Sequence, residues 1–406
     1  MKKIFLFAAS MLLSLNLMAV TYPLQIGGVD VDDTNASDFY GDGTVSYDPD
    51  ANALTLSNAH MNENIWYHPT WAEDSQFEVR ILGKCVIDYN GGSSAGAIYA
   101  MVKHLYINGY GTEPAELEIR NVNNTYFGQA IKVRGNGSEQ ILHLSGLKVK
   151  AESDATYAIE CEELHIGTLT TLEAVGAVDQ PALSNPVDPT KLVETKLVYS
   201  TKNSFALQDG HRIIIVPESL VKEYDGVLIK GQKINNYTVN DVFEDETGST
   251  WDDAKGILTV KGESYSNSED VPMLDFSRKA TINFEGGAYK TLNNNSSYAA
   301  IHTTADLTIS SGPELTMSSY GTSAIDLDLA TNDILLTLDK AHLGTIGGSS
   351  YSIQGLGTTH KANIVFKDCL IDNMNNVNGI NNATLTNCRF DVSGIELQGG
   401  KFVDAS

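Results

Sequence analysis

One eight-residue phrase recurs along the chain and constrains its fold more than any other feature. In its first copy the phrase reads LTLSNAHM and covers residues 54–61. Its first three residues alternate apolar, variable and apolar, which is typical of a strand with one buried face. A polar or turn-forming pair follows and suits a bend, and a small or apolar residue then leads into the next strand. Further copies begin at Leu142, Leu336, Ile364 and Ala383.

A strand–bend–strand unit that recurs along a chain predicts stacked coils, that is, a β-solenoid. Equivalent side chains should then lie above one another, with Leu56, Leu338 and Leu385 pointing into the interior. A leucine-rich repeat fits less well because its Asn ladder and its longer consensus are missing. An immunoglobulin-like sandwich does not predict one phrase that recurs in register. Helical periodicity is not evident, so we expect very little helix.

The chain also carries an internal duplication at an offset of about two hundred residues, judged from order and spacing. The matching segments are 24–31 with 227–234, 46–56 with 250–260, 97–99 with 300–302, and 129–131 with 323–325. Each copy opens with a hairpin-rich block, which we interpret as an N-terminal β cap over the open end of a solenoid. We therefore expect an all-β protein of two tandem units. The first unit with its cap covers 20–205, a join covers 206–225, and the second unit with its cap covers 226–406.

Residues 1–19 have the form of a secretory signal. Lys2 and Lys3 precede an apolar run that reaches Met18, and Ala19 offers a small residue for cleavage. No later stretch is long and apolar enough to span a bilayer. We expect an exported, soluble, bacterial protein that resides in the periplasm, on the cell surface or outside the cell. The net charge of −24 over 406 residues opposes binding to nucleic acid and to anionic membranes.

The four cysteines are too few to form a disulfide scaffold in a chain of this length. Cys369 and Cys388 are distinctive because they fill the same slot of the repeated phrase, about one coil apart. Stacked strands lie ~4.8 Å apart, within the reach of a disulfide. Two interpretations therefore remain open for this pair, a disulfide or two stacked buried thiols.

A cluster of aspartates in the first cap, including Asp30, Asp32 and Asp33, could provide oxygen ligands for calcium. The segment lacks the Gly that an EF-hand loop requires, and the second cap has its acidic residues at other spacings. The alternative is a solvated, turn-rich acidic surface. The histidines form no His-x-His or Cys-His cluster in the sequence, so we predict no zinc site and no cofactor beyond this calcium candidate.

Aromatic residues give the clearest indication of binding. Trp66, Tyr67 and Trp71 lie in what we interpret as an insertion between the first and second coils, and loops that leave a rigid stack commonly carry function. Exposed rings could stack on sugar faces. The alternative is that they cover the open end of the core, because aromatic side chains bury large areas.

The repeated phrase, the tandem caps and the signal resemble secreted bacterial right-handed parallel β-helix proteins of the pectate-lyase-like architecture. The resemblance covers most of both halves, and it implies a right-handed coil and binding to or action on a polysaccharide. We find no nucleophile, base and orienting residue that could form a catalytic set. We therefore expect a non-catalytic binding or surface-structural protein whose partner is a polysaccharide or another cell-surface polymer. The alternative is a β-helix polysaccharide lyase or glycoside hydrolase. The oligomeric state is not indicated.

Overall fold

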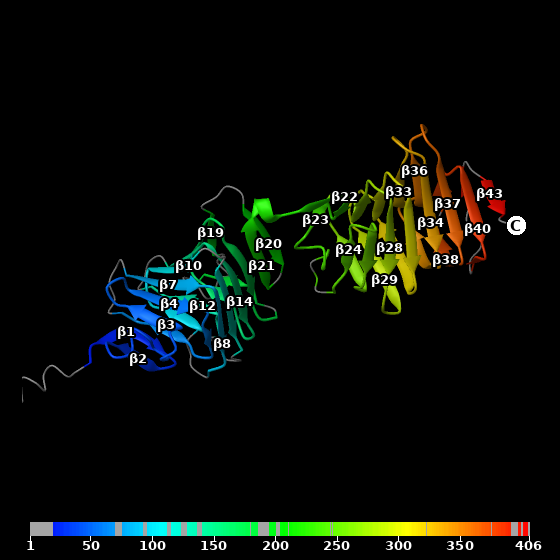
Figure 1. Ribbon diagram of the computed structural model, residues 1–406. Coiled ribbons are helices and arrows are strands. Elements are labelled where there is room, and N and C mark those ends of the chain that lie inside the picture. The colour runs from blue at the N-terminus through cyan, green and yellow to red at the C-terminus, as the bar shows by residue number, and fades with distance from the viewer. Residues whose placement is uncertain are drawn as a thin grey trace, which may run out of the picture. The chain divides into compact units, whose positions relative to one another are not determined.

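A computed structural model describes residues 19–404, apart from 70–74, 92–95, 112–114, 123–127, 136–139, 179, 186–194, 200–203, 210, 244, 246, 322, 375, 391–396 and 399–400. Strands dominate the described residues, and the one helical segment among them is a short 3-10 turn, η1 (Glu218–Leu220). The chain separates into two compact units, residues 1–220 and 221–406. Figure 1 shows each unit as a stack of short strands. The predicted signal segment lies almost entirely outside the described residues.

The first unit contains three seven-stranded sheets, here called sheets A, B and C. Sheet A contains, in spatial order, β2 (Val29–Asp32), β1 (Thr21–Ile26), β6 (Ile65–Tyr67), β9 (Ile98–Ala100), β12 (Ile131–Val133), β15 (Ile159–Glu160) and β18 (Leu183–Ser184). Sheet B contains β3 (Val45–Asp48), β4 (Ala53–Ser57), β7 (Gln76–Leu82), β10 (His104–Tyr110), β13 (Ile141–Ser145), β16 (Glu163–Ile166) and β19 (Lys196–Tyr199). Sheet C contains β5 (His60–Met61), β8 (Lys84–Tyr89), β11 (Ala115–Asn121), β14 (Leu147–Ser153), β17 (Thr171–Val175), β21 (Arg212–Pro217) and β20 (Ser204–Asp209).

The second unit repeats this plan in sheets D, E and F. Sheet D contains β23 (Gln232–Asn235), β22 (Glu223–Ile229), β27 (Leu274–Phe276), β30 (Ile301–Thr303), β33 (Ser323–Asp328), β36 (Tyr351–Leu356), β39 (Val377–Asn378) and β42 (Leu397–Gln398). Sheet E contains β24 (Thr250–Asp252), β25 (Ile257–Val260), β28 (Ala280–Phe284), β31 (Leu307–Ser311), β34 (Ile334–Asp339), β37 (Ala362–Lys367), β40 (Asn382–Thr386) and β43 (Lys401–Asp404). Sheet F contains β26 (Ser264–Asn267), β29 (Tyr289–Asn294), β32 (Glu314–Ser319), β35 (His342–Gly347), β38 (Leu370–Met374) and β41 (Arg389–Phe390).

Each coil takes one strand from each sheet of its unit. In the first unit β9, β10 and β11 form one coil, and β12, β13 and β14 form the next. Successive coils pair in parallel, as β10 does with β13 over five residue pairs. This arrangement confirms the predicted parallel β-solenoid.

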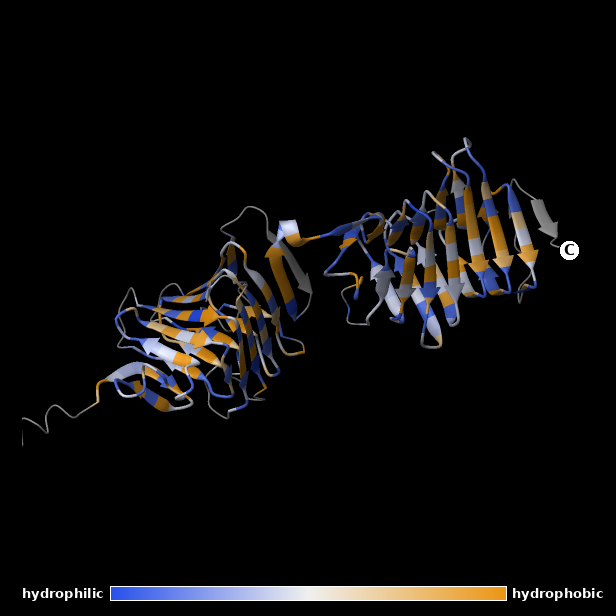
Figure 2. Cartoon of the chain, viewed as in Figure 1, coloured by the Kyte–Doolittle hydropathy of each residue, from blue (hydrophilic) through white to orange (hydrophobic). Residues whose placement is uncertain are grey.

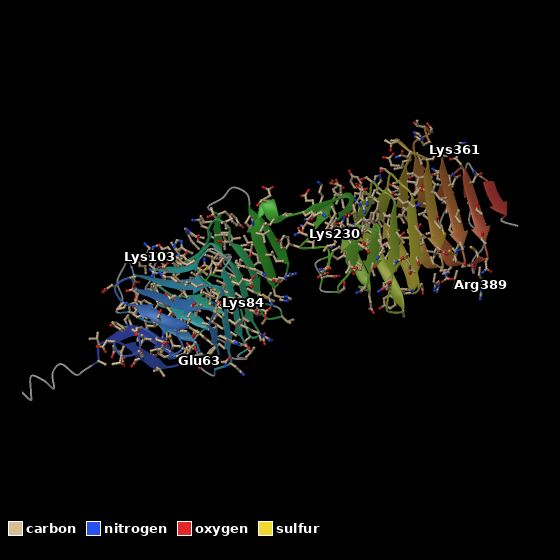
Figure 3. All side chains as sticks on the ribbon, viewed as in Figure 1. Glu63, Lys84, Lys103, Lys230, Lys361 and Arg389 are labelled. Carbon is tan, nitrogen blue, oxygen red and sulfur yellow. The ribbon has the colours of Figure 1, made fainter. Side chains whose placement is uncertain are left out.

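The core of each unit consists of the inward side chains of the alternating strands. Leu56 and Leu338 are 0% and 1% exposed, and Leu385 packs against the core of the second unit, as predicted. Orange and blue residues alternate along the strands in Figure 2, which reflects this two-residue period. Most charged side chains stand on the outside of the coils, as the exposed Lys84 and Lys361 do in Figure 3, whereas Lys290 is fully buried.

The bend of the repeated phrase has a fixed backbone conformation. Its fifth residue has a positive φ in all five copies, and these residues are Asn58, Gly146, Lys340, Asp368 and Asn387. Asn, Asp and Gly tolerate this left-handed region better than other residues do, which explains why they recur in this slot. Lys340 is the exception and bears the steric cost of its Cβ.

Antiparallel hairpins open both units. Strand β1 pairs with β2 and β3 with β4, and the second unit repeats the arrangement with β22–β23 and β24–β25. The segment predicted as a join is mostly strand: β20 and β21 form a hairpin that ends sheet C at Pro217, and β22 begins at Glu223. The apolar run at 213–216 lies in β21, which pairs antiparallel with β17 and so closes the first unit.

Candidate functional site

Two of the three predicted aromatic residues lie in a strand and not in a loop. Trp66 and Tyr67 belong to β6, and their neighbouring side chains point to opposite faces of sheet A. Tyr67 is 3% exposed, and its ring stacks on Phe77 with centroids 4.2 Å apart. The expectation that Tyr67 offers an exposed ring is therefore wrong, because the ring fills the core. Trp71 lies outside the described residues.

Trp66 belongs to a row of side chains on the outer face of sheet A. Strand pairing places Trp66 opposite Tyr99, Tyr99 opposite Lys132, and Lys132 opposite Glu160. We call these four residues the first-unit row. The rings of Trp66 and Tyr99 are nearly parallel, at 11° with centroids 6.4 Å apart, which is within the range of offset stacking. An aromatic pair thus adjoins a charged pair.

The charged pair of the first-unit row is unusually buried for the outer face of a sheet. Lys132 Nζ lies 3.0 Å from Glu160 Oε1, and the side chains are only 9% and 13% exposed. Gln129, which is itself buried, donates its Nε2 hydrogen to Glu160 Oε2 at 2.7 Å. Each charge is therefore compensated within the row, as a buried charge must be.

Two buried polar atoms of this region have no hydrogen-bond partner in the described part of the chain. They are Trp66 Nε1, a donor, and Gln129 Oε1, an acceptor. A buried unpartnered polar atom costs about 1–3 kcal/mol, so such atoms are rare and require an explanation. A ligand that offers both hydroxyl hydrogens and hydroxyl oxygens would satisfy both.

The second unit has a different set of residues at the corresponding position of sheet D. Strand pairing aligns Asp275, His302 and Asp326 across β27, β30 and β33. We call these three residues the second-unit row. His302 Nδ1 lies 2.8 Å from Asp275 Oδ1, and His302 Nε2 lies 4.0 Å from Asp328 Oδ2. The imidazole thus has a carboxylate on each side.

Two side chains of the second-unit row, His302 and Asp326, have raised pKa values. The hydrogen bond that the protonated His302 donates to the Asp275 carboxylate raises the pKa of His302 above its usual value. Burial raises the pKa of Asp326, although Ser323 donates a hydrogen bond to this carboxylate and opposes the shift. A histidine with a raised pKa that lies beside carboxylates can exchange protons with a bound molecule.

A third cluster lies on the outer face of sheet B. It was not predicted from the sequence. Tyr106, His143 and His165 oppose one another on β10, β13 and β16. The Tyr106 and His143 rings stack with centroids 4.3 Å apart, and His104 Nδ1 lies 3.1 Å from His143 Nε2. Burial, reinforced by the nearby His165 and His104, lowers the pKa of His143 to about 4. Only the pairing of coils brings these histidines together.

The predicted calcium ligands serve other purposes. Asp32 Oδ1 accepts hydrogen bonds from the Thr34 backbone at 2.9 Å and from the Asn35 backbone at 3.2 Å, so it stabilises its own turn. Asp30 Oδ1 accepts from Gln25 Nε2 at 2.7 Å, and Asp33 Oδ1 accepts from the Val20 backbone at 3.2 Å. These carboxylates do not form a convergent ligand group, so the predicted calcium site is not supported. In the described residues the convergent group is instead Glu314, His342 and Asp372.

Both cysteines of the predicted pair carry free thiols. Cys369 and Cys388 precede the paired residues Leu370 and Arg389, so they occupy equivalent positions on adjacent coils. Cys369 Sγ lies 3.1 Å from the Leu338 carbonyl oxygen. The structure thus matches the interpretation as stacked thiols, and the burial of Cys369 raises its pKa to about 11.

Within the described residues no helix is long and apolar enough to cross a membrane. Comparison with protein-family models found no matching family. Comparisons with curated proteins and with solved structures found no significant match either. The right-handed winding and the resemblance to pectate-lyase-like proteins therefore stay predictions.

Proposed function

We propose that this protein is an exported, non-catalytic binding protein for an extracellular polysaccharide, and that the first-unit row contacts the sugar. The observation that carries the proposal is the unpartnered Trp66 Nε1 in one of two nearly parallel rings, with a second unpartnered atom, Gln129 Oε1, on a side chain that contacts Glu160 at the other end of the row. Sugar hydroxyls both donate and accept hydrogen bonds, and the apolar faces of sugar rings stack on aromatic rings.

The charges of the row favour a neutral polymer. Lys132 and Glu160 neutralise each other at 3.0 Å, so neither offers a free charge to a ligand. The net charge of −24 repels acidic polymers at long range. Because strand pairing repeats the outward positions every ~4.8 Å, a row of this kind suits an extended chain better than a compact ligand.

A glycan array followed by calorimetry tests the proposal. Trp66→Phe removes the indole N–H and keeps a ring, whereas Trp66→Ala removes both. We expect Trp66→Phe to weaken binding about five-fold, the equivalent of one hydrogen bond of about 1 kcal/mol, and Trp66→Ala to weaken it further. Tyr320→Ala in the second unit is the matched control, because Tyr320 is 76% exposed and lies outside the row. Wild-type protein that binds no glycan, or a Trp66→Ala variant that binds as well as wild type, would contradict the proposal.

A second candidate function is acid–base cleavage of a polysaccharide at the second-unit row. His302 between Asp275 and Asp328 is the observation that favours it, since hydrolases need two carboxylates and lyases need a base. The test incubates the protein with the glycans that bind and measures new reducing ends and unsaturated products. Product formation that is lost in His302→Gln supports cleavage. Intact glycans after incubation with wild-type protein exclude it for those substrates.

A further inference from the structure

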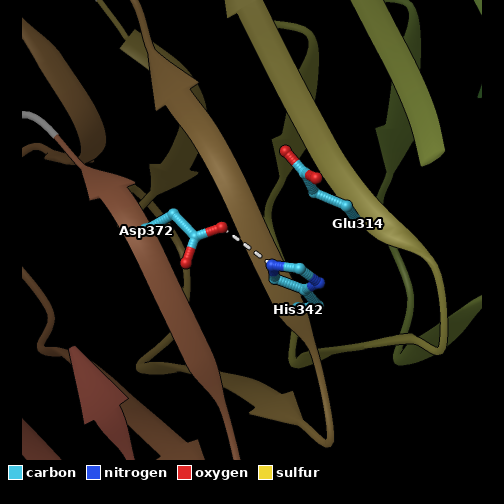
Figure 4. A group of neighbouring side chains, drawn as sticks. All are labelled: Glu314, His342 and Asp372. Carbon is cyan, nitrogen blue, oxygen red and sulfur yellow. Dashed lines mark hydrogen bonds and ion pairs between the residues drawn. The ribbon is translucent and has the colours of Figure 1, made fainter. Parts of the chain in front are cut away.

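We propose that Glu314, His342 and Asp372 form a binding site for a divalent transition-metal ion of the zinc class on the outer face of sheet F. The three residues lie on the consecutive strands β32, β35 and β38, and their side chains converge in Figure 4. One ligand atom from each residue lies within 4.8 Å of those of the other two. His342 Nε2 is 2.8 Å from Asp372 Oδ2. The site is separate from the first-unit row and does not depend on polysaccharide binding.

A β-bulge adjoins this group of side chains. Glu314 pairs directly with His342, and the register between β32 and β35 then shifts between Leu315 and Met317. The shift gives β35 one more residue than its neighbour at this point. Bulges redirect side chains and are frequent beside functional sites.

Gly344 lies in the bulge and leaves the space that Glu314 occupies. A Cβ atom on Gly344 would lie 2.4 Å from Glu314 Oε1 and 2.9 Å from its Cγ. The pairing of Leu343 with Ile371 and of Thr345 with Asn373 sets Gly344 opposite Asp372. The carboxylate of Glu314 therefore lies over a residue without a side chain, on the side where His342 and Asp372 are found.

The donor set selects the kind of ion. One imidazole nitrogen with two carboxylates suits zinc and neighbouring divalent transition metals, whereas calcium and magnesium prefer oxygen ligands alone. Two carboxylates and a neutral imidazole carry a charge of about −2, which a divalent cation balances. An ion pair would need only His342 and Asp372, so it does not explain the position of Glu314. Three protein ligands also leave coordination positions for water or a ligand atom.

Metal binding to the full-length protein tests the site. After dialysis against a chelator, we expect the wild type to bind Co²⁺ with visible absorption bands and to bind one equivalent of Zn²⁺ at this site by calorimetry. His342→Ala and the conservative Glu314→Gln should each weaken Zn²⁺ binding more than ~10-fold, since each removes or weakens a ligand. Gly344→Ala should weaken it too, because the new methyl group displaces the Glu314 carboxylate.

The matched control is His360→Ala. His360 lies 3.4 Å from Asp333 in a simple ion pair and belongs to no convergent group in the described residues. We expect this variant to bind Zn²⁺ as the wild type does and to show the same rise in melting temperature on adding Zn²⁺. Unchanged Zn²⁺ affinity in His342→Ala, or an equal loss in His360→Ala, would overturn the site and leave His342 and Asp372 as an ion pair only.

Discussion

The two units carry different side chains at corresponding positions of their corresponding coils. The first-unit row on sheet A carries Trp66, Tyr99 and Lys132. The second-unit row on sheet D carries Asp275, His302 and Asp326. The inward neighbours of these residues are buried in both units, and all but Thr303 are apolar. Because inward and outward side chains alternate, the outer row can change completely while the core stays intact.

In the first-unit row the two charged side chains pair with each other. In the second-unit row two side chains have raised pKa values. Lys132 and Glu160 compensate each other at 3.0 Å, and the rest of the first-unit row is aromatic. In the second unit the pKa of His302 and that of Asp326 are both raised, by a hydrogen bond and by burial respectively. A duplicated solenoid can thus acquire two kinds of surface without a change of scaffold.

The largest expected effect comes from removing a charge from each row. Lys132→Met leaves the Glu160 carboxylate buried without its cation, and we expect a loss of about 3–5 kcal/mol in the free energy of unfolding. Asp326→Asn removes a carboxylate whose pKa burial already raises, and the amide oxygen can still accept from Ser323. We expect a change of less than about 1 kcal/mol there. Urea unfolding of the full chain measures both.

Adding Glu160→Gln to Lys132→Met should restore most of the lost stability, because no unpaired charge then remains. Equal effects of Lys132→Met and Asp326→Asn would mean that the two rows do not differ in how they compensate charge.

The core and the bends of this fold could be predicted because their signals are local. The apolar positions of the repeated phrase and its fifth residue, Asn58 or Gly146 for example, depend on neighbours a few residues away. The duplication could also be predicted, because short local segments align. For example, aligning 97–99 with 300–302 places Tyr99 against His302. The hairpin caps followed from the alignment.

The rows themselves could not be predicted, because they depend on the register between coils. His143 and His165 are distant in sequence and become neighbours only through the pairing of β13 with β16. Likewise Glu314, His342 and Asp372 come together only through the pairing of β32 with β35 and of β35 with β38. Strand β6 is only three residues long, too short to show an alternating pattern, so Trp66 was assigned to a loop.

A smaller effect is an opposite response of the two units to pH. The pKa of His143 in the folded first unit is about 4, below its usual value of 6.5, so its contribution to stability is complete above pH 6.5 and is lost as the pH falls toward 4. The pKa of His302 in the second unit is raised above 6.5, so its contribution is complete below pH 6.5 and is lost as the pH rises through the folded pKa. We expect about 1 kcal/mol for His143, since solvent screens a partly exposed group, and a change of opposite sign with pH for His302.

Thermal unfolding of the full chain between pH 4 and pH 8.5, in steps of about half a unit, measures this response. His143→Gln should flatten the acid side of the stability profile, and His302→Gln the alkaline side. Two variants that flatten the same side would show that the rows respond to protons in the same way.

The smallest expected effect concerns one tryptophan in each unit. Trp66 Nε1 is buried without a partner, so Trp66→Phe removes an unsatisfied donor and should leave the free energy of unfolding unchanged or raise it by up to about 1 kcal/mol in the absence of ligand. Trp251 Nε1 donates to Asp253 at 3.4 Å, and its ring lies 5.1 Å from the Arg278 guanidinium. Trp251→Phe should therefore lower stability by about 1 kcal/mol. Urea unfolding of the two variants measures whether each substitution raises or lowers the free energy of unfolding. A clear loss of stability in Trp66→Phe would mean that its N–H is satisfied in solution without a sugar, and the argument for a ligand at the first-unit row would then lose its main support.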